Sequence, residues 1–306
     1  MNLSINPSYF CNFSCDFCYL TKKQLKDQTS FSLIKLNDLL KQVPHIDYVD
    51  LYGGEIGALK KDYFRLLKLV IREHYDGEIN IITNLSIMNQ EFFEDDISLT
   101  VSYDFEARER HEEVYNNMLM LPKPFSILIL ASPEVIKMNV SDMIVELNVL
   151  ANLTSVEIKP YSTNQANSHD VTHKEYEEFI MEWVEHPIEK NFRFGNEDYI
   201  ARSLAGDYNA FSDDHVYITP NGKFAVLEFD LNDNEFFLEL DSFKEYEQWA
   251  KNEKKCLSTI CKHCKYLGRC LTEHYRFVKD LDNSCSGYKG LLERYDGLED
   301  TTRTLS

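Results

Sequence analysis

Hydrophobic and polar positions change their period along the first half of the chain. Short runs rich in β-branched and aromatic residues alternate with stretches in which apolar residues recur every three or four positions. The short runs predict β-strands, and the stretches with the longer period predict helices. The six predicted strands cover residues 3–10, 48–53, 78–84, 99–104, 125–131 and 155–162.

Helix-start signals accompany the longer stretches. Ser32 stands before a run with helical spacing, Ser132-Pro133 provides a cap followed by a first-turn proline, and Thr172 with Glu175 forms a capping box. Several of the strands are near-continuous apolar runs, as expected for parallel strands covered on both faces. Six strand–helix units predict an α/β fold, a partial (β/α)6 TIM-like barrel, in which ligands collect at the carboxyl ends of the strands.

The pattern changes near residue 190. Three short runs then predict antiparallel strands, and a turn at Pro220-Asn221-Gly222 joins the first two. A helix after them leads into a second group of cysteines. We therefore expect a barrel over residues 1–190 and a smaller unit of β-hairpin and helix over residues 191–306. The predicted strands of the smaller unit are residues 215–219, 223–229 and 235–240.

Charge and composition exclude several classes of partner. The net charge of −19 argues against nucleic acid, because a phosphate backbone is bound by clustered Lys and Arg, which the sequence lacks. A basic peptide or a small polar molecule suits this charge better. The N-terminus does not resemble a signal peptide, and no apolar run reaches the ~18 residues of a membrane span. We therefore expect a cytoplasmic protein without a membrane partner, whose thiols stay reduced.

The eight cysteines form two groups at opposite ends of the chain. In a reducing compartment, clustered cysteines are more often metal ligands than disulfides. The first group, Cys11-x3-Cys15-x2-Cys18, directly follows a predicted strand. Its thiolates could surround a four-iron cubane that keeps one iron open to a cofactor or substrate, or could hold structural zinc with a distant fourth ligand. The second group comprises Cys256, Cys261, Cys264, Cys270 and Cys285.

The first group resembles the cysteine loop of the radical S-adenosylmethionine superfamily. The spacing is the same, the loop follows the first barrel strand, and an aromatic residue, Phe17, precedes the third cysteine. The resemblance covers about residues 3–190. It implies a [4Fe-4S] cluster whose open iron is chelated by S-adenosylmethionine, and a 5′-deoxyadenosyl radical that abstracts a hydrogen from the substrate.

A second match closes the second predicted strand. Gly53-Gly54-Glu55 resembles the family's Gly-Gly-Glu motif, and Ile56 replaces the proline that usually follows. The resemblance implies that these three residues bind the methionine moiety, with the glycines allowing close approach of the backbone. The competing interpretation is a turn that merely ends a strand.

Other strand ends resemble family positions around the cofactor. Thr83-Asn84 ends the third strand, and Ser102 and Asp104 end the fourth, so the resemblance implies that Phe17, Ser102 and Asp104 bind the cofactor. Capping of strand ends is the alternative role for these side chains. Lys159 and Tyr161 end the sixth strand and are candidate substrate contacts. No residue is assigned as a catalytic acid or base.

The second group of cysteines resembles the SPASM or Twitch extension of radical enzymes. Its Cys261-x2-Cys264-x5-Cys270 run and later Cys285 imply an auxiliary [4Fe-4S] cluster, although zinc would accept the same ligands. The full pattern holds two clusters, but here no cysteine follows the Pro220-Asn221-Gly222 turn closely. We expect one auxiliary cluster, acting as an electron relay or a structural clip. Whether Cys256 or His274 also ligates it stays open.

These resemblances imply an oxidoreductase-like peptide maturase. Such an enzyme would crosslink, epimerise or oxidise a ribosomally synthesised peptide, or form a thioether in it. The alternatives are a small-molecule dehydrogenase, epimerase or decarboxylase, and a non-catalytic interaction protein stabilised by metal. The implied partners are the substrate and an electron donor of the flavodoxin or ferredoxin type. Because the cysteine motif begins at Cys11, we expect a peptide substrate either to be gripped by the barrel mouth and the C-terminal unit or to be delivered by a separate leader-peptide-binding protein.

Overall fold

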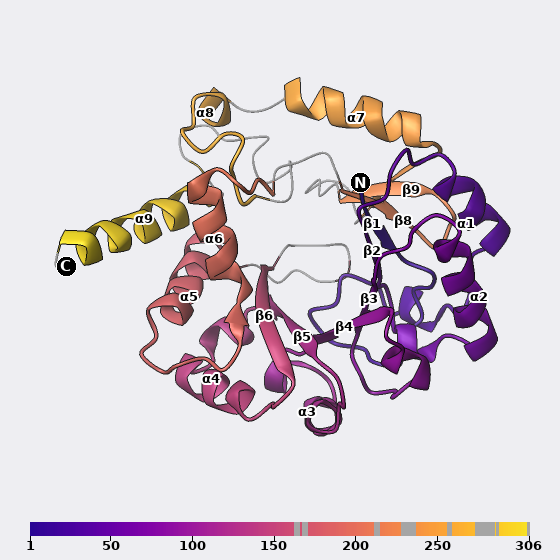
Figure 1. The fold of residues 1–306 in the computed structure, drawn as a ribbon, viewed down its shortest axis with the longest axis horizontal. Helices are drawn as coiled ribbons and strands as arrows, with labels where there is room; N and C mark the ends of the chain where they lie inside the picture. The colour runs from indigo at the N-terminus through magenta and orange to yellow at the C-terminus, as the bar shows by residue number, and fades with distance from the viewer. Residues whose placement is uncertain are drawn as a thin grey trace.

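The computed structural model describes residues 1–161, 166, 171–210, 215–227, 237–255, 259–272, 285 and 288–304 (Figure 1). The strands are β1 (Asn2–Ile5), β2 (Tyr48–Leu51), β3 (Ile79–Thr83), β4 (Ile97–Ser102), β5 (Phe125–Ala131), β6 (Leu153–Pro160), β7 (Arg193–Phe194), β8 (His215–Ile218), β9 (Phe224–Leu227) and β10 (Phe237–Leu240). The helices are α1 (Leu33–Leu40), α2 (Lys61–Arg72), α3 (His111–Leu119), α4 (Val140–Asn148), α5 (His173–Glu185), α6 (Gly195–Ala205), α7 (Phe243–Lys255), α8 (Thr259–Lys262) and α9 (Lys289–Thr304).

One sheet carries all of these strands, in the order β10-β9-β8-β1-β2-β3-β4-β5-β6-β7. Neighbouring strands from β1 to β7 are parallel, and β8 is parallel to β1. The helices that connect β1 to β7 lie around the outside of the curved sheet, as Figure 1 shows. The expected α/β fold is confirmed, and an open barrel fits this topology, although a 3-10 helix (Gln90–Phe93) is the only helix between β3 and β4, and β7 with α6 adds a unit that the sequence did not predict.

Side chains on the sheet alternate between a core face and an inner face. In β5, Phe125, Ile127 and Ile129 are buried, whereas Leu128 and Leu130 between them stay partly exposed. β4 has the same period. The expectation of strands covered on both faces is therefore wrong for β4 and β5, because the helices cover only one side of an open barrel.

The first strand is shorter than its apolar run predicts. β1 ends at Ile5, and the chain then crosses the carboxyl end of β2. The amides of Gly54 and Glu55 donate to the carbonyls of Ser8 and Phe10, at 3.0 and 2.7 Å. These bonds satisfy polar backbone groups that the sheet leaves free, so the chain departs from the sheet to form the cysteine loop.

The C-terminal hairpin continues the barrel sheet. β9 pairs antiparallel with both β8 and β10, as the sequence predicts. The turn between β8 and β9 places Gly222 at φ +69°, a conformation that glycine adopts without strain. Because β8 also pairs with β1, the sheet runs across the predicted boundary at residue 190 without a break. The division into two units stays a prediction.

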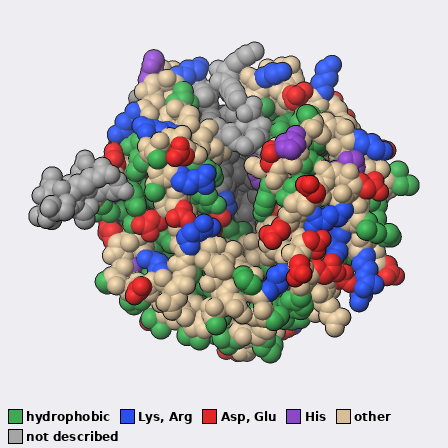
Figure 2. All heavy atoms as spheres, in the orientation of Figure 1, with side chains coloured by type: hydrophobic (Ala, Val, Ile, Leu, Met, Phe, Trp, Pro, Cys, Tyr) green, Lys and Arg blue, Asp and Glu red, His purple; other side chains and the backbone are tan. Residues whose placement is uncertain are grey.

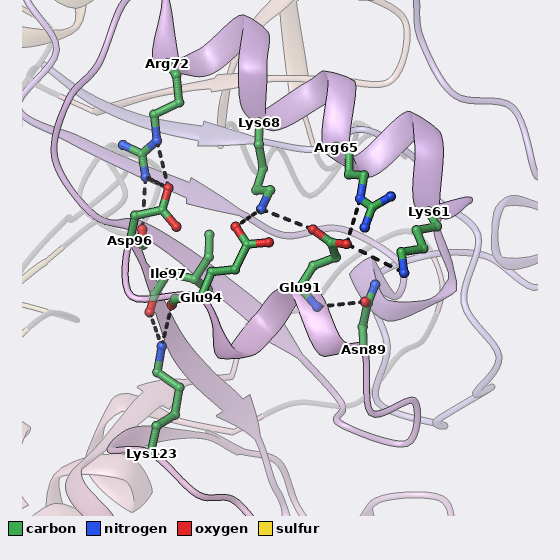
Figure 3. Close-up of polar contacts among 10 residues, drawn as sticks. All are labelled: Lys61, Arg65, Lys68, Arg72, Asn89, Glu91, Glu94, Asp96, Ile97 and Lys123. Carbon is green, nitrogen blue, oxygen red and sulfur yellow. Dashed lines mark hydrogen bonds and ion pairs between the residues drawn. The ribbon is translucent and has the colours of Figure 1, made fainter.

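Helix α2 is tied to the segment before β4 by a row of ion pairs (Figure 3). Glu91 is only 5% exposed and accepts from Arg65 Nε at 2.8 Å and from Lys68 Nζ at 3.4 Å. Lys68 also pairs with Glu94. A hydrogen bond with Glu94, together with the nearby cations, holds the pKa of Glu91 below its usual range. The charged form of Glu91 therefore stabilises the folded chain.

We predict that Glu91→Gln lowers the free energy of unfolding by ~1–3 kcal/mol near pH 7, because Lys68 and Arg65 lose a charged acceptor. The pKa of Glu91 is lower in the folded chain than in the unfolded chain. Its contribution to the free energy of unfolding is therefore present above the pKa of the unfolded chain and is lost as the pH falls through the pKa of the folded chain. Urea unfolding between pH 7 and pH 3 measures this, with Glu178→Gln, an exposed pair on α5, as the control. Equal losses in both variants would contradict the prediction.

Candidate functional site

The cysteine loop packs directly on the two glycines that follow β2. A Cβ built on Gly54 would lie 1.9 Å from the carbonyl oxygen of Phe10, and one on Gly53 would lie 2.1 Å from Oδ1 of Asn6. Gly53 also has φ +148°. Glycine is therefore required here so that the backbone leading into Cys11 can approach β2. Space for a bound methionine, the reason expected from the sequence, is not what these contacts show.

Backbone amides point at the sulfur atoms of this loop. The amide of Phe13 donates to Cys11 Sγ and that of Leu20 to Cys18 Sγ, each at 3.4 Å. Burial raises the pKa of Cys11 to about 12 and that of Cys18 to about 11, and the neighbouring thiols add to both shifts. Without a metal these thiols stay protonated at neutral pH, so binding of a metal centre would release protons.

Cys11, Cys15 and Cys18 line one cavity and fit a metal centre by their chemistry, since thiolates are the ligands of iron–sulfur clusters and of zinc. The described residues contain no group of three His, Cys, Asp or Glu side chains arranged to hold a metal ion.

A cavity of about 330 Å³ opens above these thiols, within the range of sites for small ligands. It lies at the carboxyl ends of the parallel strands, and its walls come from β2 to β6, β8 and the cysteine loop. Of the residues proposed from the sequence, the cavity brings together Cys11, Cys15, Cys18, Phe17, Gly53, Gly54, Ser102, Asp104, Lys159 and Tyr161.

Among the residues proposed to bind the cofactor, Glu55 is the one that does not line this cavity. Its carboxylate is 2% exposed and accepts from the amides of Gly57 and Asn84, both at 2.7 Å, and from the hydroxyl of Thr83 at 2.5 Å. Burial raises the pKa of Glu55, and these hydrogen bonds oppose the shift. The carboxylate thus joins the ends of β2 and β3.

Asp104 lines the cavity, but its carboxylate is occupied by the protein. It accepts from Arg108 Nε at 2.8 Å and from the amide of Leu130 at 2.6 Å. The guanidinium of Arg108 is 11% exposed and lies 5.5 Å from the ring centroid of Phe17. Its charge also opposes the rise that burial causes in the pKa of Cys15. Asp104 therefore positions a cation beside the cysteine loop.

Arg108 is a site residue that the sequence reasoning missed. The spacing of four residues from Asp104 is the signal that could have found it, because such pairs interact along one helical turn. Tyrosines were missed as well. The rings of Tyr52 and Tyr217 lie 5.9 Å apart in an edge contact, and both line the cavity together with Tyr19. No sequence spacing relates these three residues.

The two proposed substrate contacts lie on the side of the cavity formed by the end of β6. Lys159 Nζ pairs with Glu157 at 2.9 Å. The hydroxyl of Tyr161 reaches the carbonyl of Phe17 at 3.5 Å, so Tyr161 also connects β6 to the cysteine loop.

Within the described residues, the second cysteine group begins with Cys261 on α8. The amide of Cys264 donates to the carbonyl of Cys261 at 3.0 Å, and the amide of Tyr266 reaches Cys264 Sγ at 3.5 Å. Burial raises the pKa of Cys270, and the nearby thiols of Cys285 and Cys264 raise it further. The structure thus brings these cysteines into one neighbourhood. Cys256 and His274 lie outside the described residues.

No protein-family model matches the chain, and no curated protein matches its sequence. Solved structures do match. Native anSMEcpe with bound AdoMet is 15% identical, with a TM-score of 0.73 and coverage of 100% of both chains. SuiB of Streptococcus suis bound to S-adenosylmethionine is also 15% identical, with a TM-score of 0.59 over 91% of this chain and 76% of SuiB. The chain shares the fold of these two proteins.

The same fold recurs in complexes with peptides. SuiB bound to its precursor peptide SuiA matches with a TM-score of 0.61 and 15% identity, over 91% of this chain and 74% of SuiB. Native anSMEcpe with bound AdoMet and Cp18Cys peptide matches over 100% of both chains at 14% identity, with a TM-score of 0.68.

Within the described residues, none of the helices has the length and apolar character that crossing a bilayer requires.

We predict that Gly54→Ala lowers the free energy of unfolding of the metal-free chain by ~1–3 kcal/mol, because its methyl group would displace the backbone of Phe10. Thermal unfolding measures the effect. Gly297→Ala on α9 is the control, since no atom lies within 4 Å of a Cβ at that position. If Gly54→Ala unfolds at the wild-type temperature, the loop does not depend on this close approach.

Proposed function

We propose that the chain is a radical S-adenosylmethionine enzyme that modifies a ribosomally synthesised peptide. The observation that carries the proposal is one cavity that is lined by the three cysteines and Phe17 of their loop together with the strand-end residues Gly53, Gly54 and Ser102. The fold supports it, because the proteins that share this fold have been solved with S-adenosylmethionine bound.

Cys11, Cys15 and Cys18 would hold three irons of a [4Fe-4S] cluster, and S-adenosylmethionine would occupy the adjoining cavity. When bound, the cluster and the cofactor supply reductive cleavage of the sulfonium and a carbon radical that abstracts hydrogen. Asp104 holds the guanidinium of Arg108 at the cavity wall, where it could pair with a carboxylate of a bound ligand. Phe13, Phe17 and Leu25 also line the cavity, and their apolar side chains would exclude water from it.

Cys261, Cys264, Cys270 and Cys285 would hold one auxiliary [4Fe-4S] cluster. Four thiolates saturate such a cluster, which leaves no open iron for substrate. We therefore assign this centre to electron relay or to bracing the segment between α8 and α9. An electron donor of the flavodoxin or ferredoxin type would reduce the N-terminal cluster.

A peptide is favoured as substrate by the complexes of proteins with this fold. SuiB has been solved with a precursor peptide, and anSMEcpe with the Cp18Cys peptide. On the face shown in Figure 2, acidic and basic side chains are interspersed rather than gathered by sign. This face therefore offers no charged patch for a peptide, and we assign peptide recognition to the cavity wall, where Lys159 and Tyr161 are the proposed contacts.

We predict that the anaerobically reconstituted chain binds about eight irons, as two cubanes require. Replacing Cys11, Cys15 and Cys18 together by Ala should halve the iron content and abolish production of 5′-deoxyadenosine. The matched control replaces Cys261, Cys264 and Cys270, which should also halve the iron but leave some cleavage of S-adenosylmethionine. Unchanged iron in the first variant, or zinc at both sites, would refute the proposal.

We predict that a precursor peptide co-expressed with the enzyme under anaerobic conditions is modified. A crosslink, a thioether or an oxidised side chain changes the mass of the peptide. Epimerisation changes its mass only when the reaction runs in D2O, because the peptide then takes up deuterium. Tandem mass spectrometry locates the change. The variant lacking Cys11, Cys15 and Cys18 is the control and should leave the peptide unmodified. Turnover of a small molecule with no change in any peptide would contradict the proposed peptide substrate and assign a small-molecule substrate to the enzyme.

A further inference from the structure

Asn84 presents its amide to a sulfur of the cysteine loop. It stands directly after β3 and is 5% exposed. Its Nδ2 lies 3.7 Å from Cys11 Sγ and 3.1 Å from Asn12 Oδ1, while its Oδ1 accepts from the amide of Ser86 at 2.9 Å and from the Ser86 hydroxyl at 2.6 Å. The backbone donor of Ser86 fixes which amide atom is the oxygen, so the NH2 group must face the sulfur.

The turn that carries Asn84 is held in a strained conformation. Leu85 has φ +54°, in the left-handed region that disfavours a branched side chain. Three hydrogen bonds maintain it. The amide of Asn84 donates to Glu55 Oε2 at 2.7 Å, the amide of Leu85 to Thr83 Oγ1 at 2.9 Å, and Asn117 Nδ2 to the carbonyl of Leu85 at 2.8 Å. Strain kept by its surroundings is a mark of functional positioning.

Both amide protons of Asn84 have acceptors within the protein, Cys11 Sγ and Asn12 Oδ1. Asn84 lines the cavity, but it has no N–H left over for a bound ligand. Its role is therefore directed at the sulfur. The backbone amide of Phe13 also reaches this sulfur, yet only a side-chain donor can be removed by substitution.

We propose that Asn84 is a positioning residue that raises the reduction potential of the N-terminal iron–sulfur centre by donating an N–H to Cys11. The inference rests on the proposed function, since it requires that Cys11 ligate a cluster. Reduction adds negative charge to the cluster and its sulfur ligands, and a hydrogen-bond donor stabilises that charge. Removal of the donor therefore makes reduction harder.

Redox titration of the anaerobically reconstituted full chain, followed by electron paramagnetic resonance, tests this. The signal of the N-terminal centre is the one that added S-adenosylmethionine changes. Asn84→Ala should shift its midpoint potential to a more negative value, and Asn84→Asp further, because a like charge then faces the sulfur. The control is Asn80→Ala on β3, the strand that leads to Asn84. The Asn80 side chain accepts from Thr100 at 3.1 Å, so its removal should leave the potential unchanged.

The outcomes separate this inference from the proposed function. If the wild-type chain gives no signal that responds to S-adenosylmethionine, the proposed function fails and the inference fails with it. If the signal responds but both Asn84 variants keep the wild-type potential, the inference alone is overturned. An unchanged potential with weaker binding of S-adenosylmethionine would assign Asn84 to the cofactor instead. An equal shift in Asn80→Ala would show a general effect of loosening β3.

Discussion

The approach of the Tyr9–Phe10 backbone to Gly54 is the constraint on which the site depends. The amide of Glu55 reaches the carbonyl of Phe10 at 2.7 Å, and no side chain fits between the two segments. Cys11 follows immediately, so this contact sets where the first thiol stands above the sheet. The thiols are thereby held at the carboxyl ends of the parallel strands, the end at which barrels of this kind bind their ligands.

Glu55 extends this constraint to the next strand. Burying a carboxylate is costly unless hydrogen bonds compensate it. Here the compensation comes from the backbone of Gly57 and from Thr83 and Asn84 at the end of β3. The same carboxylate therefore fixes the turn from which Asn84 reaches Cys11. A residue that the sequence motif suggests as a ligand contact thus also organises the residues that surround the sulfur.

The opposite wall is organised by a second buried acid. Asp104 is fully buried and binds both Arg108 and the amide of Leu130, which joins the segment after β4 to β5. The guanidinium of Arg108, held by Asp104, lies over the ring of Phe17, which is part of the cysteine motif. Two buried carboxylates thus hold a hydrogen-bond donor and a cation against one loop. Both groups favour negative charge on the thiolates that a metal cluster requires.

The sequence by itself determined the α/β class, the six strands β1 to β6, the C-terminal hairpin and the cysteine loop, because local periodicity, turn residues and ligand spacing are properties of short segments. The family resemblance of the cysteine loop and of the strand ends also indicated ten of the residues that line the cavity, and these meet because parallel strands bring their carboxyl ends to one edge. Only the tertiary structure decided that Glu55 faces inward, that Arg108 and Tyr217 join the wall, and that β8 extends the barrel beside β1. These outcomes depend on which strands become neighbours and how far each side chain reaches, and no local pattern encodes either.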